Sequence, residues 1–347
     1  MIRHVSLRID NSYLDSFLYS GALFLLGMDG ELTSFDWQKV VLSTLAAHDR
    51  SDLSPIFLDS KEQTALDQGD AGRELEIPKS ILRESRTSTI NWSVWPTDLN
   101  IYANQLYISD ETGVYVTSFD YDSKSIRQSD VRNIKGGYVY SIAPGDGGRL
   151  AIAGVDRGLS VLILDGQERT LVEDDIFDCD WFGTKLVANS SNSSYLASFA
   201  PLPRKENFSD IRDFFASMKH AKNAEPVTAK IEPASPREYR WLAGEDVIED
   251  LPHDMATIEE LDSRVIKARS ASFGSIIEYS DRMIIQRSDD RDALDIRRPF
   301  FWRTFSRSKN YLNHLHVCDN TGMQIRAYDT QERGRDRFSV ELSDFEV

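Results

Sequence analysis

The chain has 347 residues, of which 40 are Lys or Arg and 56 are Asp or Glu, so its formal charge at pH 7 is −16. This balance argues against a protein that binds nucleic acid over its whole surface, because binding to phosphates needs a cationic surface. With 41% hydrophobic and 28% charged residues, the composition is that of a folded globular protein and excludes a largely disordered chain.

Two cysteines, Cys179 and Cys318, are too few for a small disulfide scaffold, and we expect them to be free thiols in a reducing compartment. The apolar stretch 21–27 is interrupted by Asp29 and Glu31 before it reaches the length of a signal sequence or a membrane span. The sequence therefore predicts a soluble, cytoplasmic protein that does not bind membranes.

Six segments share one plan, in which two apolar strands flank a turn rich in Asp, Asn, Ser and Gly. These turn residues tolerate the backbone conformations that a tight hairpin requires. The plan therefore predicts six β-hairpins, at residues 23–36, 106–119, 150–163, 186–199, 283–296 and 315–328.

The spacing of the hairpins predicts the architecture. Leu106, Leu150 and Leu186 begin successive hairpins at intervals of 44 and 36 residues, and the longer intervals before Leu106 and after Leu186 leave room for hidden units. A propeller blade typically uses four antiparallel strands in about 40–45 residues. We therefore expect an all-β fold, a β-propeller of about seven four-stranded blades, with a pair of β-sandwiches as the competing fold.

In architecture the chain resembles WD40-like propellers over most of its length. The Gly-His and Trp-Asp signatures of that family do not recur, and the nearest sequences, at 35–37 and 179–181, have Asp before Trp. The resemblance implies a repeat fold suited to binding other proteins and leaves the subfamily open.

Residues 201–272 break the repeat with five prolines and helical spacing, which predicts an insertion between propeller regions 1–200 and 273–347. One helix is expected to start at Ser209 as N-cap and to carry Ile211, Phe214, Phe215 and Met218 on one face. The face either packs on the propeller or docks a partner protein through Phe214, Phe215 and Met218.

A second helix is expected after the capping box formed by Thr257 and Glu260. Its apolar stripe and basic end are Ile258, Leu261, Arg264, Val265, Ile266, Lys267 and Arg269. Helical spacing also occurs inside the expected first blade, at Trp37, Val40, Val41, Thr44, Leu45 and His48.

No linear catalytic motif is present, although propeller enzymes can assemble a site from loops of several blades. In a strand, His314, His316 and Cys318 would point to one side, yet Cys318 would lie about 13 Å from His314, too far to share a metal ion. We therefore interpret the histidines as locally hydrogen-bonded and predict neither a metal nor a cofactor. Two acidic groups are interpreted as solvated turns: Glu173, Asp174, Asp175, Asp178 and Asp180, and Asp289 with Asp290.

Residues 296–317 contain no acidic side chain, which reverses the charge of the rest of the chain. Cations alternate with aromatic residues there: Arg297, Arg298, Phe300, Phe301, Trp302, Arg303, Phe305, Arg307, Lys309 and Tyr311. Such a segment suits nucleic acid, an acidic protein partner, or a blade core with arginines at its rim.

These observations predict a non-catalytic β-propeller scaffold subunit of a cytoplasmic multiprotein complex. Its expected partner-binding residues are Arg297, Arg298, Trp302, Arg303, Phe305 and Arg307, with Phe214, Phe215 and Met218 on the inserted helix. The alternatives are a propeller-fold hydrolase with an active site in its central channel and an accessory subunit that contacts nucleic acid through residues 297–311.

Overall fold

The computed structural model describes residues 3–59, 66–92, 94–145, 148–154, 158–163, 167–182, 185–190, 194–200, 203, 207, 210–223, 227–231, 265–279, 282–286, 291–294, 299, 301–305 and 307–329. The chain folds into two compact units. Unit 1 comprises Met1–Asn91, Asp120–Ile126 and Asp250–Val347, and unit 2 comprises Trp92–Phe119 and Arg127–Glu249.

The first sheet of unit 1 is antiparallel, in the order β2-β3-β4-β6. Its strands are β2 (Tyr13–Tyr19), β3 (Ala22–Gly27), β4 (Glu31–Asp36) and β6 (Arg86–Asn91). The hairpin predicted at 23–36 is confirmed as β3 and β4. Gly30 closes its turn with φ +83°, a left-handed conformation that glycine adopts without steric cost.

Helices fill the sequence between the third and fourth strands of this sheet. They are α1 (Trp37–Ala47), η1 (Ser51–Leu53), α2 (Ser54–Leu58) and α3 (Lys79–Ser85), with the strand β5 (Arg73–Glu76) before α3. Asp36 caps α1 by accepting the Lys39 N–H at 3.0 Å. The helical spacing noted after residue 36 is the buried face of α1, except for His48, which is the exposed C-cap. The long interval before Leu106 therefore holds helices where a hidden blade was expected.

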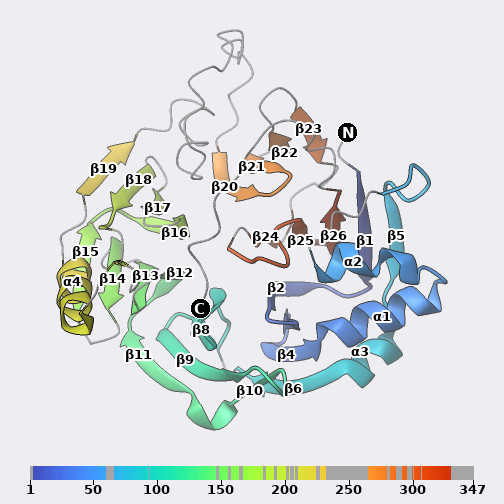
Figure 1. The fold of residues 1–347 in the computed structure, drawn as a ribbon, viewed down its shortest axis with the longest axis horizontal. Coiled ribbons are helices and arrows are strands. Elements are labelled where there is room, and N and C mark those ends of the chain that lie inside the picture. The colour runs from blue at the N-terminus through green and yellow to red at the C-terminus, as the bar shows by residue number, and fades with distance from the viewer. Residues whose placement is uncertain are drawn as a thin grey trace. The chain divides into compact units, whose positions relative to one another are not determined.

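The last sheet of unit 1 joins the two ends of the described chain, in the order β24-β25-β26-β1-β5 (Figure 1). Its strands are β24 (Phe301–Thr304), β25 (His314–Asp319), β26 (Gly322–Tyr328), β1 (His4–Ile9) and β5. β1 runs antiparallel to β26, with Leu7 opposite Ile325, and β5 lies parallel to β1. The side chains of Leu7 and Ile325 are fully buried in the main core of unit 1.

The third sheet of unit 1 contains β20 (Val265–Ala271), β21 (Gly274–Tyr279), β22 (Met283–Gln286) and β23 (Arg291–Leu294). The predicted helix after Thr257 is wrong from Val265 onward, because those residues pair with β21 as a strand, while Thr257 and Glu260 lie outside the described residues. Pairing with a neighbouring strand outweighs the local helical pattern. The short strand β10 (Ser125–Ile126) also belongs to unit 1.

Unit 2 contains three sheets. The first holds β7 (Asp98–Tyr102), β8 (Gln105–Ser109), β9 (Gly113–Asp120) and, after η2 (Gln128–Asp130), β11 (Arg132–Gly136). The second holds β12 (Val139–Gly145), β13 (Arg149–Gly154), β14 (Gly158–Ile163) and β15 (Glu168–Val172). The third holds β16 (Ile176–Phe182), β17 (Lys185–Ser190), β18 (Ser194–Ser198) and β19 (Val227–Ile231).

The other five predicted hairpins are also confirmed. They are β8–β9, β13–β14, β17–β18, β22–β23 and β25–β26. In the sheet of β20 to β23 the hairpin occupies the third and fourth strands, whereas in each other sheet it occupies the second and third.

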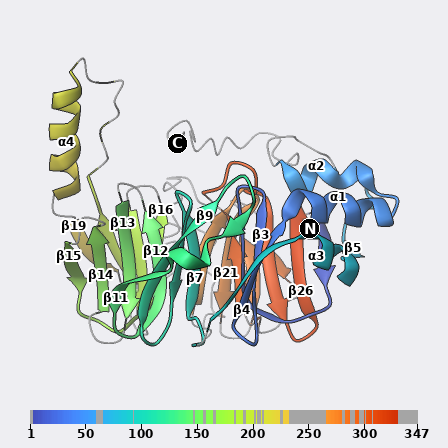
Figure 2. The same ribbon diagram turned by 90° about the horizontal axis from the view of Figure 1, so that it is seen from below.

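The helix α4 (Ile211–Asn223) lies between β18 and β19 in the sequence. Figure 2 shows it standing beyond the ends of the strands of unit 2 instead of lying across a sheet face. Within the insertion predicted at 201–272, the described residues thus form α4 together with the sheet strands β19 and β20.

Meanders of consecutive antiparallel strands, with the final sheet completed by the N-terminal strand, are the construction of a β-propeller. The all-β propeller class is confirmed. The described residues form six sheets, three in each unit, so the prediction of about seven blades is wrong. The helical insertion was expected between blades. The described helices instead lie within sheets: α1 to α3 come between β4 and β6, and α4 comes between β18 and β19, in each case the third and fourth strands of a sheet.

Candidate interaction site

The helix α4 is capped at its start and attached to β13 near its end. At its start, the carbonyl of Asp210 accepts the Phe214 N–H at 3.2 Å and its carboxylate accepts the Arg212 N–H at 2.8 Å. Asp210 is therefore the N-cap, and Ser209, which the sequence suggested for this role, lies outside the described residues. Near the other end, Nη2 of Arg149 in β13 donates to the Ala221 carbonyl at 3.2 Å.

The apolar side chains of α4 are only partly covered. Ile211 is 53% exposed and Phe215 is 62% exposed, while Phe214 and Met218 are half-buried. The rings of Phe214 and Phe215 lie 5.4 Å apart. The structure thus brings the three helix residues predicted to bind a partner onto one face and leaves the Phe215 ring open to solvent.

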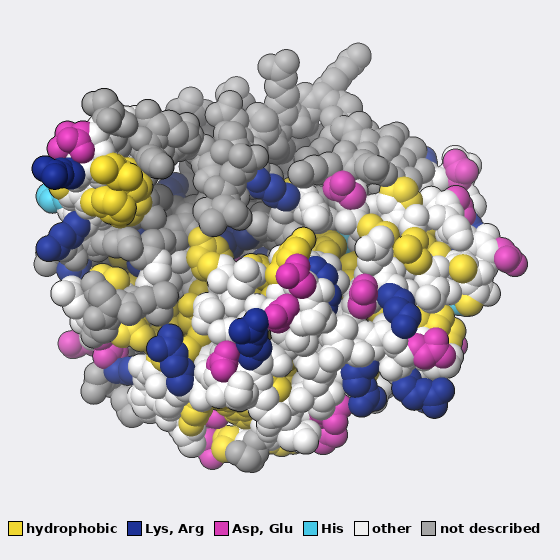
Figure 3. Space-filling view, turned by 60° about the horizontal axis from the view of Figure 1, so that its bottom comes forward, with side chains coloured by type: hydrophobic (Ala, Val, Ile, Leu, Met, Phe, Trp, Pro, Cys, Tyr) yellow, Lys and Arg dark blue, Asp and Glu magenta, His cyan; other side chains and the backbone are white. Residues whose placement is uncertain are grey.

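Cationic side chains flank this face. Arg212 and Lys219 precede and follow Phe215 by three and four residues, so both lie beside its ring on the helix surface, and both are exposed. In Figure 3 hydrophobic side chains gather over α4 at the upper left, with Lys or Arg and Asp or Glu side chains beside them. The face therefore combines apolar contact area with positive charge in a chain of net charge −16.

Residues 297–311, which we call the basic aromatic segment, contribute Trp302, Phe305 and Tyr311 to the buried core of unit 1. Trp302 is 2% exposed and Phe305 is 4% exposed. Nε1 of Trp302 donates to Glu278 at 2.5 Å, and the Phe305 ring lies 5.5 Å from that of Phe17. For these two rings the structure supports the interpretation as blade core, because a partner cannot contact a ring that is buried.

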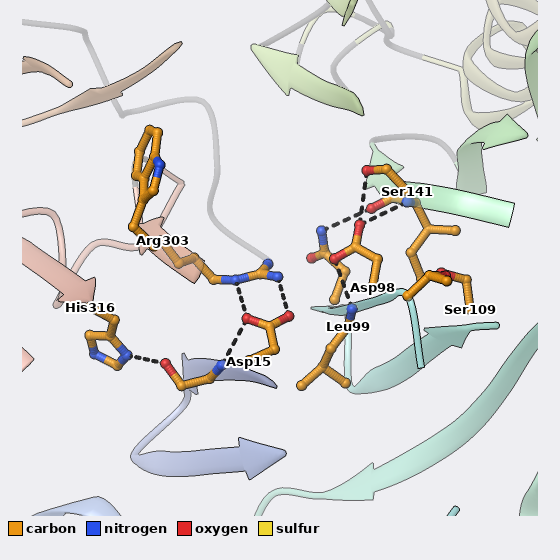
Figure 4. Close-up of polar contacts among 12 residues, drawn as sticks. Asp15, Asp98, Leu99, Ser109, Ser141, Arg303 and His316 are labelled. Carbon is orange, nitrogen blue, oxygen red and sulfur yellow. Dashed lines mark hydrogen bonds and ion pairs between the residues drawn. The ribbon is translucent and has the colours of Figure 1, made fainter. Parts of the chain in front are cut away.

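Arg303 is engaged within unit 1 (Figure 4). Its Nε and Nη2 donate to the two carboxylate oxygens of Asp15 at 3.1 and 2.5 Å. The guanidinium also stacks over the Phe17 ring at 4.9 Å. Asp15 follows a β-bulge in β2, which directs its side chain toward β24, so this two-pronged ion pair joins the first and last sheets of unit 1.

The remaining cations of the segment differ in placement. Arg307 is exposed, and Lys309 is half-buried. Arg297 and Arg298 lie outside the described residues. Contact with nucleic acid through residues 297–311 stays a prediction, and so does contact of Arg307 with a protein partner.

The two histidines of β25 are core residues. Nδ1 of His316 is hydrogen-bonded to Ser16 Oγ at 2.6 Å, and Nδ1 of His314 to Asn313 Oδ1 at 2.9 Å. Burial lowers the pKa of His314 to about 3 and that of His316 well below its usual value, so both imidazoles are neutral at pH 7.

Cys318 shares this core. Its Sγ accepts the Tyr13 N–H at 3.2 Å, and Cys179 is buried in unit 2, so the predicted free thiols are confirmed. Throughout the described part of the chain, no three His, Cys, Asp or Glu side chains are grouped so that they could hold a metal ion.

Several carboxylates of unit 2 act as structural acceptors. Asp98 in β7 accepts from Ser141 Oγ and from the Ile142 N–H, both at 2.9 Å, and so ties β7 to β12 (Figure 4). Within the acidic group expected to be a solvated turn, Asp174 accepts from Tyr195 and Asp178 accepts from Asn189. These carboxylates are therefore bound within the fold.

The sequence analysis missed a group of aromatic side chains at the surface of unit 2, which we call the aromatic cluster. It consists of Trp92, Trp95, Tyr115, Tyr138 and Tyr140. Trp95 is 61% exposed and Tyr138 is 41% exposed. A signal was present in Trp-x-x-Trp at 92–95 and Tyr-x-Tyr at 138–140, which lie between the predicted hairpins.

Among the described residues, no helix is long and apolar enough to cross a membrane.

No protein-family model matches the chain, and no curated protein matches it. Several solved structures are similar in fold. PorZ, a bacterial surface component of the type IX secretion system of Porphyromonas gingivalis, is 13% identical over 87% of this chain, with a TM-score of 0.39. The chain covers only 29% of PorZ.

Two further similar structures are propeller domains. The WD40 domain of Pan2 from Neurospora crassa is 8% identical over 94% of this chain and 89% of its own, with a TM-score of 0.41. The β-propeller domain of Cps50 (Swd1) from Myceliophteria thermophila is 14% identical over 67% of this chain and 64% of its own, with a TM-score of 0.37. At these low scores, the propeller assignment rests on the strand order of this chain.

Proposed function

We propose that this chain is a non-catalytic β-propeller interaction module, a subunit of a cytoplasmic multiprotein complex, which binds a partner protein through the apolar face of α4. The exposed ring of Phe215 carries this proposal. A large apolar side chain in water gains free energy when a partner covers it, by about 25 cal/mol for each Å² removed from solvent. An aromatic ring on a fixed helix suits the hydrophobic anchor that helix-in-groove binding uses.

The contacts near the two ends of α4 support this role. The Asp210 cap stabilises the helical conformation, and the Arg149 contact at Ala221 attaches the helix to β13 before a partner arrives. A helix that is already formed loses less conformational entropy on binding than a segment that must first fold. The propeller serves here as a rigid support for one interaction element.

The charges beside Phe215 indicate the chemistry of the partner. Arg212 and Lys219 are exposed on both sides of the ring. They complement a hydrophobic groove that has Asp or Glu side chains at its rim. The proposed partner is therefore a protein with an acidic, apolar groove.

Site-specific cross-linking in the native host tests the proposal. A photoreactive amino acid replaces Phe215 on the apolar face or, as a matched control, the exposed His220 on the same helix. One partner should be cross-linked at position 215 and not at 220, and Phe215→Ala should remove it from the complex without changing the circular dichroism spectrum. Equal cross-linking at both positions, or a complex that survives Phe215→Ala unchanged, would refute the role of this face.

A further inference from the structure

The aromatic cluster of unit 2 is built around the turn between β8 and β9. Asp110 in this turn is 1% exposed. One of its carboxylate oxygens accepts the N–H groups of Thr112 and Gly113, at 2.7 and 3.0 Å, and the other accepts Nε1 of Trp92 at 3.0 Å. The turn is therefore fixed, and the Trp92 ring is fixed to it.

Further hydrogen bonds bring three segments to this turn. Thr97 donates its N–H to the Ser109 carbonyl at 2.7 Å and its hydroxyl to the Val139 carbonyl at 2.5 Å. The Val139 N–H donates in turn to the Asp110 carbonyl at 3.3 Å. The described residues of 92–97 therefore lie beside 109–115 and 137–140 in unit 2.

The rings stand on this frame in two pairs. Trp92 and Tyr115 are 5.1 Å apart and edge to face, as are Tyr138 and Tyr140 at 5.2 Å. Tyr138 and Tyr140 are two residues apart in the chain, so they point to the same side, opposite to the buried Val139 between them. Trp95 is the most exposed of the five.

The polar groups of two side chains in the cluster already form hydrogen bonds within the protein. Nε1 of Trp92 is bound by Asp110, and the hydroxyl of Tyr115 is hydrogen-bonded to Thr112 at 2.7 Å. For these two residues, the free part is the ring itself. Exposed Trp and Tyr rings held in place are typical of binding hot spots.

The charge around the rings indicates the ligand. The three segments contain the acids Asp110 and Glu111 and contain no Lys or Arg, and Glu111 is exposed at the tip of the turn. Aromatic faces carry negative electrostatic potential and attract ammonium and guanidinium groups within about 6 Å of the ring. Both features favour a cationic ligand.

We infer that the aromatic cluster binds a basic segment of a partner protein, whose Lys or Arg side chains stack on Trp95 and Tyr138 and pair with Glu111. The site is separate from the apolar face of α4, which carries positive charge and fits an acidic groove. The chain thus offers two surfaces of opposite charge preference.

Peptide binding to the full chain tests this inference. The probe is a short peptide of alternating Arg and Ser, and the matched peptides carry Glu or Pro in place of Arg. Affinity is measured by calorimetry at about 0.15 M salt, where charges farther apart than about 8 Å are largely screened. The Arg peptide should bind, and the Glu and Pro peptides should bind at least tenfold more weakly.

Variants locate the site without changing the net charge. Trp95→Ala removes an exposed ring and should weaken binding of the Arg peptide by about tenfold, which corresponds to about 1.4 kcal/mol and lies between the values for exposed and desolvated cation–π contacts. Tyr121→Ala, which removes a 55% exposed ring in unit 1, is the matched control. Phe215→Ala should also leave the affinity unchanged, which separates this site from α4.

Glu111→Gln should weaken the binding further and reduce its dependence on salt. Several results would overturn the inference: no binding of the Arg peptide, equal affinity in Trp95→Ala and Tyr121→Ala, or tighter binding of the Pro peptide. The last result would identify the cluster as a site for proline-rich segments.

Discussion

Two buried imidazoles predict that the stability of unit 1 falls in acid. His314 and His316 are fully buried, and burial lowers the pKa of His314 to about 3. The usual pKa of an unfolded histidine is about 6.5. Between these values the unfolded chain takes up a proton that the folded chain excludes, so the associated stability is present above about pH 6.5 and is lost as the pH falls.

We expect the free energy of unfolding to decrease between pH 7 and pH 5, measured by urea denaturation. His314→Phe should flatten this dependence, because its ring would be placed beside Trp37, Phe57 and Tyr311 without a group to protonate. His220→Phe, at an exposed position, is the control. If His314→Phe keeps the pH dependence of the parent protein, the acid sensitivity has another origin.

The ion pair of Arg303 and Asp15 predicts a large stability effect. The two side chains are only 18% and 11% exposed, so Arg303→Ala leaves a mostly buried carboxylate without its main partner. Breaking such a pair costs about 3–5 kcal/mol when it is buried, and a reduced loss is expected here because some water reaches it. Denaturant unfolding should show a loss of about 2–4 kcal/mol.

The exposed Arg307→Ala should change stability by less than about 0.5 kcal/mol. Similar stability in the two variants would show that the ion pair contributes little. Because Trp302 and Arg303 are structural, loss of partner binding in variants of these residues has to be separated from loss of folding. No local pattern could have predicted this pair, since its members are 288 residues apart in the chain.

At the scale of elements, local signals predicted hairpins better than helices. A hairpin turn of Asp, Asn, Ser and Gly is determined by residues that are close in the sequence, so it can be recognised locally. All six predicted hairpins form. The capping box at Thr257 pointed to a helix, but residues from Val265 onward found a strand partner in β21. A local preference for helix is overridden where a neighbouring strand offers hydrogen bonds and burial.

The Asp210 cap predicts a coupling between the start of α4 and partner binding. Asp210→Ala removes the acceptor for the Arg212 N–H and should destabilise the helix by about 1 kcal/mol. Amide hydrogen exchange in α4 should become faster, and the partner should bind several-fold more weakly although Phe215 is intact. Asp213→Ala is the control in the same turn, and unchanged exchange after Asp210→Ala would show that the cap does not hold the helix.

At the scale of the whole molecule, the interval between hairpins predicted a propeller but not its number of sheets. The count of about seven assumed that each long interval hides a blade. The first interval is occupied by α1, η1, α2, β5 and α3, whose buried faces complete the core of unit 1. Spacing alone does not distinguish a missing repeat from an insertion.

The candidate site was predictable in part. The apolar face of α4 could be predicted from helical periodicity. The same apolar stripe is present whether the helix packs on the propeller or binds a partner, so periodicity shows the face but not what covers it. The basic aromatic segment was harder, since burial of Trp302 and Phe305 depends on contacts with Glu278 and Phe17 from other strands. The aromatic cluster lay outside the repeat, and its frame joins three separated segments.

The last sheet of unit 1 contains strands from both ends of the described chain, so we expect the stability of unit 1 to depend on the N-terminal strand β1. Leu7 in β1 is fully buried and faces Ile325 of β26, so Leu7→Ala should cost about 2–5 kcal/mol in denaturant unfolding. Hydrogen exchange should speed up in β24 to β26. The neighbouring Arg8→Ala serves as control, because Arg8 is partly exposed and its ion pair with Glu74 lies at the surface. Equal stability in both variants would show that β1 is not needed.

The strand β5 has a consequence for the behaviour of the protein at high concentration. It forms the outer edge of the last sheet, and its sequence Arg-Glu-Leu-Glu places exposed charges at Arg73, Glu74 and Glu76. An uncovered edge at β1 would offer free backbone groups to a strand from another molecule, whereas charges on an edge disfavour such addition. At β5 this device disfavours the addition of a strand from another molecule to the sheet that joins the two ends of the described chain.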